Sequence, residues 1–85
     1  MKSNLKKNVP LSSLDDRSRK ILQYVVESYI ENGNPVASKV ISKKINPTLA
    51  SATIRNVMAK LERLDLLRSP HISAGRIPTD TGLQF

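Results

Sequence analysis

The stretch that decides the fold reads Pro70-His71-Ile72-Ser73-Ala74-Gly75-Arg76-Ile77-Pro78-Thr79. It is a short polar turn with a basic tip, and proline closes it on both sides. It follows a long amphipathic segment, Ser51 to Leu64. A helix followed by a basic hairpin allows a small domain to touch DNA twice, once in the major groove and once beside it. DNA is therefore the first partner to consider for the remaining sequence.

The composition is that of one small domain and excludes several classes of site. The chain has 85 residues, and its hydrophobic fraction of 39% must pack mostly through aliphatic side chains, since there is one Phe and no Trp. The absence of cysteine excludes a disulfide framework and a Cys-ligated zinc site, and a single His leaves no protein-only transition-metal site. We expect no cofactor, no membrane-spanning segment and no signal peptide, and hence a cytoplasmic protein.

Positive charge is unevenly distributed along the chain, whose net charge is +7. Residues 1–12 carry three lysines and no acidic residue, whereas residues 13–33 carry three basic and four acidic residues. Residues 34–85 carry eight basic and three acidic residues, a net charge of +5. Polyanions are the expected partners, nucleic acid before an anionic membrane, although such a charge can also serve only to keep a small protein soluble.

The first part of the chain predicts a basic arm and a long helix. Residues 1–12 are expected to be a flexible arm, and residues 13–85 a single domain. Ser13-Leu14-Asp15-Asp16 resembles a capping box at a helix start. Gly33 is expected to end this helix after Asn32, because glycine accepts a left-handed backbone. The apolar stripe of the helix consists of Ile21, Leu22, Val25, Val26, Tyr29 and Ile30.

The rest of the chain predicts two more helices and a hairpin. A short helix over Lys39–Lys44, capped by Ser38, is expected to turn three residues inward, namely Val40, Ile41 and Ile45. The third helix, Ser51–Leu64, is expected to bury Ile54, Val57, Met58, Leu61 and Leu64. A strand over Leu66–Arg68, a turn in which Gly75 supplies a positive backbone dihedral, a return strand over Arg76–Ile77 and a helix capped by Thr79 follow. These elements define a winged helix-turn-helix of the mainly α (α+β) class.

Catalysis finds no support in this sequence. Asp15 and Asp16 are neighbours, so on a helix they point about 100° apart and cannot share a site. His71 lies near serine and aspartate residues, but an exposed hairpin offers neither a buried orienting acid nor an oxyanion hole. The three glycines stand apart, at positions 33, 75 and 82, and form no phosphate-binding loop. We therefore do not expect an enzyme.

The third helix carries the candidate base contacts. In a helix-turn-helix, the N-terminal part of the second helix of the motif meets base edges. Arg55 can pair bidentately with guanine and Asn56 with adenine. Ser51 and Thr53 suit phosphates or a thymine methyl group, and Lys60 lies on the same outer face. The alternative is that these residues form only the solvated face of an amphipathic helix.

The hairpin and the short helix add further candidates. Arg76 can reach a phosphate or the minor groove, together with Ser73. His71 is either a structural hydrogen-bonding residue at the base of the hairpin or a DNA contact. The lysines of the short helix are expected to face the DNA backbone and to add salt-dependent affinity, namely Lys39, Lys43 and Lys44.

Three stretches of this sequence resemble one known family, the N-terminal domain of the HrcA heat-inducible transcription repressors. They are Asn34-Pro35-Val36-Ala37-Ser38-Lys39, Ser51-Ala52-Thr53-Ile54-Arg55-Asn56-Val57-Met58-Ala59-Lys60-Leu61-Glu62 and Ser69-Pro70-His71-Ile72-Ser73-Ala74-Gly75-Arg76-Ile77-Pro78-Thr79-Asp80. The resemblance runs from Leu14 to Phe85. It departs from the family pattern at four positions, where Ala replaces a capping Ser, Val an acid, Asp a Gly and Ile a Thr: Ala50, Val57, Asp65 and Ile72.

The resemblance implies a bacterial, nucleoid-associated repressor of chaperone genes that binds a long inverted repeat, the CIRCE operator, as a dimer. It also implies assistance from the GroEL chaperonin and a larger C-terminal region with a GAF-like fold. We therefore expect this chain to be a DNA-binding fragment or a lone homologue of one, monomeric without that C-terminal region. Two alternatives remain, a winged-helix module for protein contacts and an RNA-binding module. Only three aromatic residues are present, so an RNA-stacking platform is missing.

Overall fold

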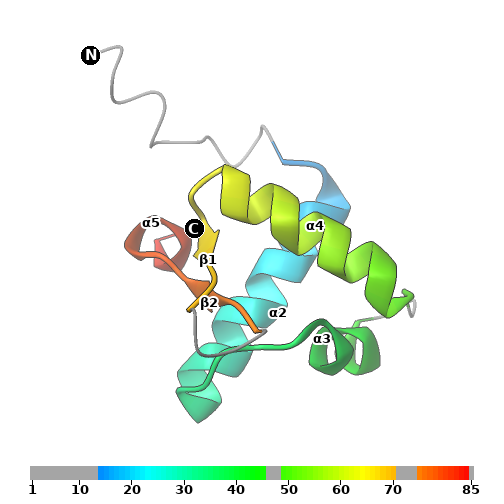
Figure 1. Ribbon diagram of the computed structural model, residues 1–85, viewed down its shortest axis with the longest axis horizontal. Coiled ribbons are helices and arrows are strands. Elements are labelled where there is room, and N and C mark those ends of the chain that lie inside the picture. The colour runs from blue at the N-terminus through cyan, green and yellow to red at the C-terminus, as the bar shows by residue number, and fades with distance from the viewer. Residues whose placement is uncertain (1–13, 46–48, 71–74, 85) are drawn as a thin grey trace.

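The computed structural model describes residues 14–45, 49–70 and 75–84. In chain order these residues form α2 (Asp16–Asn32), α3 (Ser38–Lys44), α4 (Ser51–Arg63), β1 (Leu67–Arg68), β2 (Ile77–Pro78) and α5 (Asp80–Leu83). In Figure 1, α4 crosses in front of α2, and α3 lies on the opposite side of the molecule from α5. The architecture is the winged helix-turn-helix that the sequence predicts.

Both ends of α2 are closed by local contacts. The Asp15 side chain, and not that of Ser13, caps its start by accepting a hydrogen bond of 2.8 Å from the backbone N–H of Ser18; Ser13 lies outside the described residues. Hydrogen bonds from the hydroxyl and backbone N–H of Ser18 hold the pKa of Asp15 below its ordinary value, and the charge of Lys60 adds to this effect. At the other end Gly33 has the expected left-handed backbone, with φ of 72°.

The two helices of the helix-turn-helix motif begin without a side-chain cap. Ala37 occupies the N-cap position of α3 and Ala50 that of α4. Ser38 was expected to be the cap of α3 but is the first residue of the helix, and no side-chain hydrogen bond caps it. The start of α4 therefore lacks the side-chain acceptor that helix N-termini usually have.

A tight turn joins α4 to the hairpin. The N–H of Leu66 donates to the carbonyl of Leu61 at 2.9 Å, and the N–H of Asp65 donates to that of Glu62 at 3.0 Å. This pattern is a Schellman motif with Asp65 in the left-handed position, at φ of 64°. The Thr79 hydroxyl donates to the Asp65 carbonyl at 2.7 Å and accepts from the N–H of Gly82 at 3.0 Å, so it caps α5 as predicted.

The return strand of the hairpin begins one residue later than the sequence predicted. Leu67 is opposite Pro78 and Arg68 is opposite Ile77 in an antiparallel register. Arg76, expected in the return strand, instead forms a β-bridge with Val36, the residue before the α3 N-cap. The hairpin is therefore also paired to the segment between α2 and α3.

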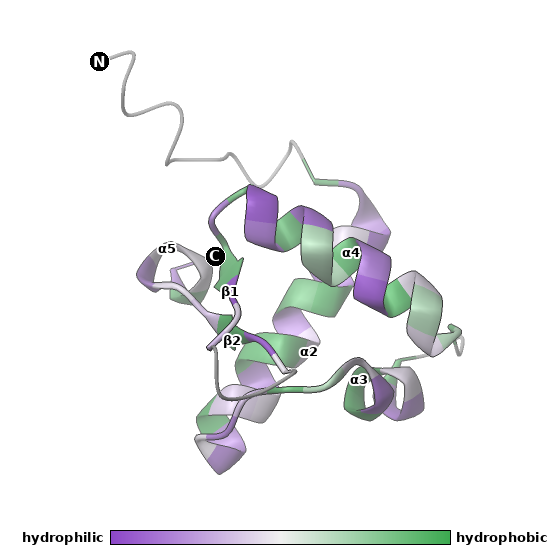
Figure 2. Ribbon diagram, in the orientation of Figure 1, coloured by the Kyte–Doolittle hydropathy of each residue, from purple (hydrophilic) through white to green (hydrophobic). Residues whose placement is uncertain are grey.

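The core consists of aliphatic side chains from α2, α3 and α4, from the segments beside these helices and from β1. Its buried members are Leu14, Ile21, Leu22, Val25, Val36, Ile41, Ile45, Ile54, Met58, Leu61, Leu66 and Leu67. Green and purple segments alternate along α2 and α4 in Figure 2, as amphipathic helices require.

Six positions expected on the buried sides of the helices are less buried than the periodicity suggested. Val40 and Ile30 are 40% and 69% exposed, and four others are only half-buried, namely Val26, Tyr29, Val57 and Leu64. In α3 only Ile41 is buried. Val40 is its neighbour in the sequence and therefore lies about 100° away round the helix. Ile30 is exposed because it lies about 140° round α2 from the buried Val25.

Candidate nucleic-acid interface

The outer surface of α4 has two flanks, one on each side of its buried stripe. Arg55 and Glu62 are seven residues apart and so share one flank, while Thr53 and Lys60 share the other. Arg55 and Asn56 are exposed, whereas Ser51, Thr53 and Lys60 are half-buried. The predicted contacts on α4 therefore do not form one patch.

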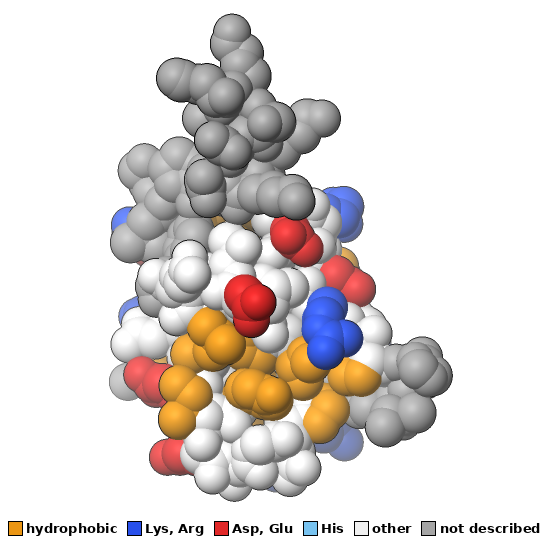
Figure 3. Space-filling view, turned by 90° about the vertical axis from the view of Figure 1, so that its left-hand side faces the viewer, with side chains coloured by type: hydrophobic (Ala, Val, Ile, Leu, Met, Phe, Trp, Pro, Cys, Tyr) orange, Lys and Arg blue, Asp and Glu red, His pale blue; other side chains and the backbone are white. Residues whose placement is uncertain are grey.

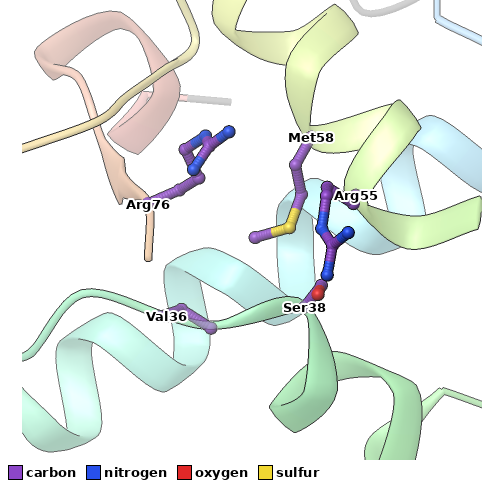
Figure 4. Close-up of a pocket in the computed structure, with 5 residues that line it drawn as sticks. All are labelled: Val36, Ser38, Arg55, Met58 and Arg76. Atoms are coloured by element: carbon purple, nitrogen blue, oxygen red, sulfur yellow. The ribbon is translucent and has the colours of Figure 1, made fainter. Parts of the chain in front are cut away.

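The flank that bears Arg55 faces the hairpin and the start of α3 across a recess. This recess has a volume of about 270 Å³ and is lined by Val36, Ser38, Arg55, Met58 and Arg76. Figure 4 shows Arg76 and Arg55 on opposite sides of the Met58 side chain. Two guanidinium groups from separate elements thus border one recess, an arrangement that suits a phosphate.

The other flank faces the start of α2. Lys60 is close enough to Asp15, the α2 N-cap, to help lower the pKa of that carboxyl. Its charge is therefore partly balanced within the domain. The structure separates Lys60 and Thr53 from the recess that Arg55 and Arg76 share.

Arg76 is held by an acidic residue that sequence reasoning overlooked. Its Nε lies 3.0 Å from Oε1 of Glu62, in the last turn of α4, and the two side chains are 20% and 37% exposed. The other carboxylate oxygen of Glu62 accepts a hydrogen bond of 3.0 Å from the Ser69 hydroxyl. The basic residue predicted to touch DNA from the hairpin is therefore already paired with the helix beside it.

The base of the hairpin is also fixed by backbone contacts. The N–H of Val36 donates to the carbonyl of Arg76 at 2.8 Å, and the N–H of Arg76 donates back at 2.9 Å. A Cβ at Gly75 would lie 2.9 Å from the carbonyl carbon of Pro35 and 3.0 Å from the nitrogen of Val36. Glycine is needed there because the backbones approach so closely, and not for the positive φ that the sequence suggested, which Gly75 does not have. The residues of the predicted turn before it lie outside the described part.

The lysines of α3 divide into two kinds. Lys39 and Lys43 are exposed, as expected for phosphate contacts. Lys44 instead reaches α2, where its Nζ lies 3.0 Å from the Ser28 hydroxyl and 3.8 Å from Oε1 of Glu31. The Lys44 side chain therefore connects α3 to α2, a contact that the sequence did not predict, whereas its proposed contact with DNA stays a prediction.

The remaining residues of the interface are two predicted contacts and two basic residues that the sequence did not single out. His71 and Ser73 lie outside the described residues. Arg63 is exposed, and its spacing of seven from Asn56 places both on one stripe of α4. Arg68 is exposed on β1. The seven-residue spacing was the available signal for Arg63, whereas the exposure of Arg68 depends on the register of the hairpin.

The face beyond the hairpin has a different character. Figure 3 views the side of the molecule that bears α5, and there hydrophobic side chains gather in one area, with both acidic and basic side chains beside it. Ile30 and Leu83 are among the exposed large hydrophobic residues of the described part. No helix in that part is long and apolar enough to cross a membrane, and no group of three His, Cys, Asp or Glu residues there is arranged to hold a metal ion.

Comparison with known proteins gives consistent matches. Residues 13–84 match the model of the family described as the winged helix-turn-helix transcription repressor HrcA, DNA-binding. The chain is 56% identical over 75 residues to the heat-inducible transcription repressor HrcA of Brucella canis and 52% identical to that of Bartonella tribocorum, covering 88% of the chain in each case. It spans 21% of the length of each of these relatives.

A solved structure agrees with the fold. It is described as the crystal structure of a hypothetical protein at 2.2 Å resolution and superposes with a TM-score of 0.82 at 52% sequence identity. The match covers 88% of this chain and 24% of the other. Sequence and three-dimensional similarity therefore cover the same large share of the chain.

Proposed function

This chain belongs to the family of winged helix-turn-helix DNA-binding domains of the HrcA transcription repressors, which is not a family of enzymes, and we propose on that premise that it binds double-stranded DNA in a sequence-specific manner. The observation that carries the proposal is the recess bordered by Arg55 of α4 and Arg76 of the hairpin. It brings one basic residue of the helix and one of the hairpin to the same edge of the molecule. A duplex that received α4 in its major groove would meet the hairpin beside it.

In the proposed complex, α4 supplies sequence readout. Arg55 and Asn56 are exposed on α4, and their side chains have the donors and acceptors that distinguish guanine and adenine in the major groove. Ser51, at the first turn, suits a phosphate or a thymine methyl group. Thr53 and Lys60 point to the other flank, so their contacts would fall on the opposite wall of the groove.

The remaining contacts position the domain on the duplex. The hairpin from Pro70 to Thr79 would lie on the flanking backbone or in the minor groove, with Arg76 as its described basic residue and with His71 and Ser73 as further candidates. Lys39 and Lys43 would face phosphates, where they add affinity that falls with salt and carries no sequence information.

The family membership supports a wider proposal for the whole protein. We propose a repressor of heat-shock genes, chaperone genes among them, that acts on a CIRCE-like inverted repeat in the bacterial cytoplasm, at the nucleoid. Two copies of the domain would occupy the two half-sites, because an inverted repeat mirrors the two-fold symmetry of a dimer. Homodimerisation through a C-terminal region and assistance by a GroEL-type chaperonin belong to the same proposal.

A binding titration tests the proposal. The 85-residue chain is titrated into a duplex that carries the CIRCE inverted repeat and into a shuffled duplex of equal composition, at several salt concentrations. We expect tighter binding to the inverted repeat and affinity that falls as salt rises. Equal affinity for both duplexes would contradict sequence-specific recognition. Preference for a single-stranded RNA competitor would favour the RNA-binding alternative, and binding to neither nucleic acid would favour a protein-contact module.

A further inference from the structure

Glu62 contacts both sides of the hairpin from the last turn of α4. Its Oε1 accepts from Nε of Arg76, which precedes β2, and its Oε2 accepts from the hydroxyl of Ser69, which follows β1, each at 3.0 Å. We propose that Glu62 is a positioning residue that sets the hairpin relative to α4, so that both meet one duplex in a single register. This inference rests on the proposed function.

The hairpin needs such a contact because it is very short. Two residue pairs form its ladder, and a two-stranded hairpin is at best marginally stable without packing against other elements. Its backbone bridge to Val36 fixes the hairpin to the segment before α3 and not to α4. Besides the turn at Asp65, the hydrogen bonds to the two carboxylate oxygens of Glu62 connect the outer hairpin to α4.

A carboxylate at this position has two opposing effects on DNA binding. It repels phosphates and compensates part of the charge of Arg76, which lowers affinity for any duplex. It also holds Arg76 at the recess across from Arg55, which favours the duplex that fits both groups. The presence of an acid beside the proposed DNA surface is explained if the second effect is what Glu62 provides.

Two substitutions separate position from charge. In Glu62→Gln, the side-chain oxygen can still accept from Arg76, and the amide nitrogen can donate to the Ser69 hydroxyl, so the geometry is kept while the charge is removed. In Glu62→Ala both charge and geometry are lost. Glu62→Asp keeps the charge, but its shorter side chain cannot span both partners. Glu27→Gln, an exposed change on α2 far along the chain from the hairpin, serves as the matched charge control.

The experiment measures the affinity of each variant for the duplex most enriched by the wild-type chain from a random pool and for a shuffled duplex, over a range of salt. The specificity ratio is the affinity for the enriched duplex divided by that for the shuffled duplex. We expect Glu62→Gln to bind both duplexes more tightly, with this ratio unchanged and with a slope of log affinity against log salt that is steeper by about one. Glu62→Ala is expected to lower the ratio by about tenfold while binding the shuffled duplex as Glu62→Gln does. Glu62→Asp should lower the ratio without steepening the salt slope, and Glu27→Gln should leave the ratio unchanged.

Other results would overturn the inference. Equal ratios in wild type, Glu62→Gln and Glu62→Ala would mean that Glu62 acts through charge alone. A ratio lost equally in Glu62→Gln and Glu62→Ala would mean that the negative charge, and not the position of Arg76, is required. Circular dichroism shows whether each variant is folded, and Glu62→Asp decides the matter if Glu62→Ala is not. A wild-type chain that enriches no duplex would instead contradict the proposed function itself.

Discussion

Arg76 of the hairpin forms an ion pair with Glu62 of α4, with Nε of the first 3.0 Å from Oε1 of the second. The pair joins the two elements that are proposed to touch DNA. The same Arg76 pairs through its backbone with Val36, so one residue connects the hairpin to α4 and to the segment before α3. Arg76 therefore has a structural role in addition to its proposed contact with DNA.

The Glu62–Arg76 pair should show a modest coupling energy in the absence of DNA. Because both side chains are partly exposed, at 37% and 20%, solvent screens the attraction, and we expect about 0.5–1 kcal/mol. A double-mutant cycle of Glu62→Ala and Arg76→Ala, followed by urea unfolding, measures it. The coupling should shrink in high salt. A value of zero at low salt would show that the ion pair adds nothing to the hairpin's attachment.

Arg55→Ala should weaken binding to the cognate duplex by about 1–3 kcal/mol and relax specificity at one base pair. The physical reason is the loss of two hydrogen bonds to guanine, which a shuffled duplex does not offer in the same place. Competition titrations with single-base variants of the duplex locate the position. Arg17→Ala, which removes an equal charge from the exposed surface of α2, is the control and should not change base preference. Equal losses on cognate and shuffled duplexes would contradict base readout by Arg55.

Lys43→Ala and Lys44→Ala should differ although the two residues are adjacent. Lys43 is exposed, so its loss should weaken binding to all sequences alike and reduce the salt slope by about one. Lys44 contacts Ser28 and Glu31 of α2, so its loss should have a smaller effect on DNA binding. Fluorescence anisotropy at several salt concentrations compares them. The assignment fails if Lys44→Ala flattens the salt slope as much as Lys43→Ala.

Ala50→Ser should stabilise the domain by about 1 kcal/mol. Ala50 has the extended backbone of an N-cap residue, with φ of −64° and ψ of 146°, but offers no acceptor to the first N–H groups of α4. A serine hydroxyl would supply one. Thermal unfolding should show a rise in Tm of about 4–8 °C. Ala52→Ser, inside the helix, is the matched control and should lower stability slightly; equal effects of the two changes would refute the capping argument.

Asp65→Gly should stabilise the domain by about 1 kcal/mol, because Asp65 holds a left-handed backbone that disfavours residues with a Cβ. The reverse change at a comparable position, Gly33→Asp, should destabilise by a similar amount, since φ there is 72°. Chemical denaturation of both variants provides the comparison. If Asp65→Gly lowers stability, the aspartate must compensate its backbone strain through contacts of its side chain.

Much of the fold was predictable because its signals are local. Gly33 ends α2, Thr79 caps α5, and the helices begin and end within one or two residues of the predicted bounds. The hydrophobic spacing of α4 correctly identified Ile54, Met58 and Leu61 as buried. Side-chain periodicity and capping chemistry act over a single helical turn, so neighbouring residues contain the necessary information.

The candidate site was predictable only in part. Arg55 and Asn56 are exposed as expected, since an amphipathic helix presents its polar residues outward. The partner of Arg76 was not foreseen, because Glu62 is distant in sequence and on a different element. Val40 was also misplaced, because a short helix buries only the side chains that face its neighbours. The contact of Lys44 with Ser28 was not foreseen either, because it joins two helices.

The sequence by itself determined the helices, the end of α2 at Gly33, the Thr79 cap of α5, the position of the hairpin and, through three motifs, the family. Those features depend on residues within a few positions of one another. Only the tertiary structure decided that Arg76 pairs with Glu62 and Val36, that Gly75 must pass against Pro35, and that Arg55 shares a recess with Arg76. Such contacts depend on the angle at which α4 crosses α2 and on where the chain returns toward β2, and both result from packing the whole core at once.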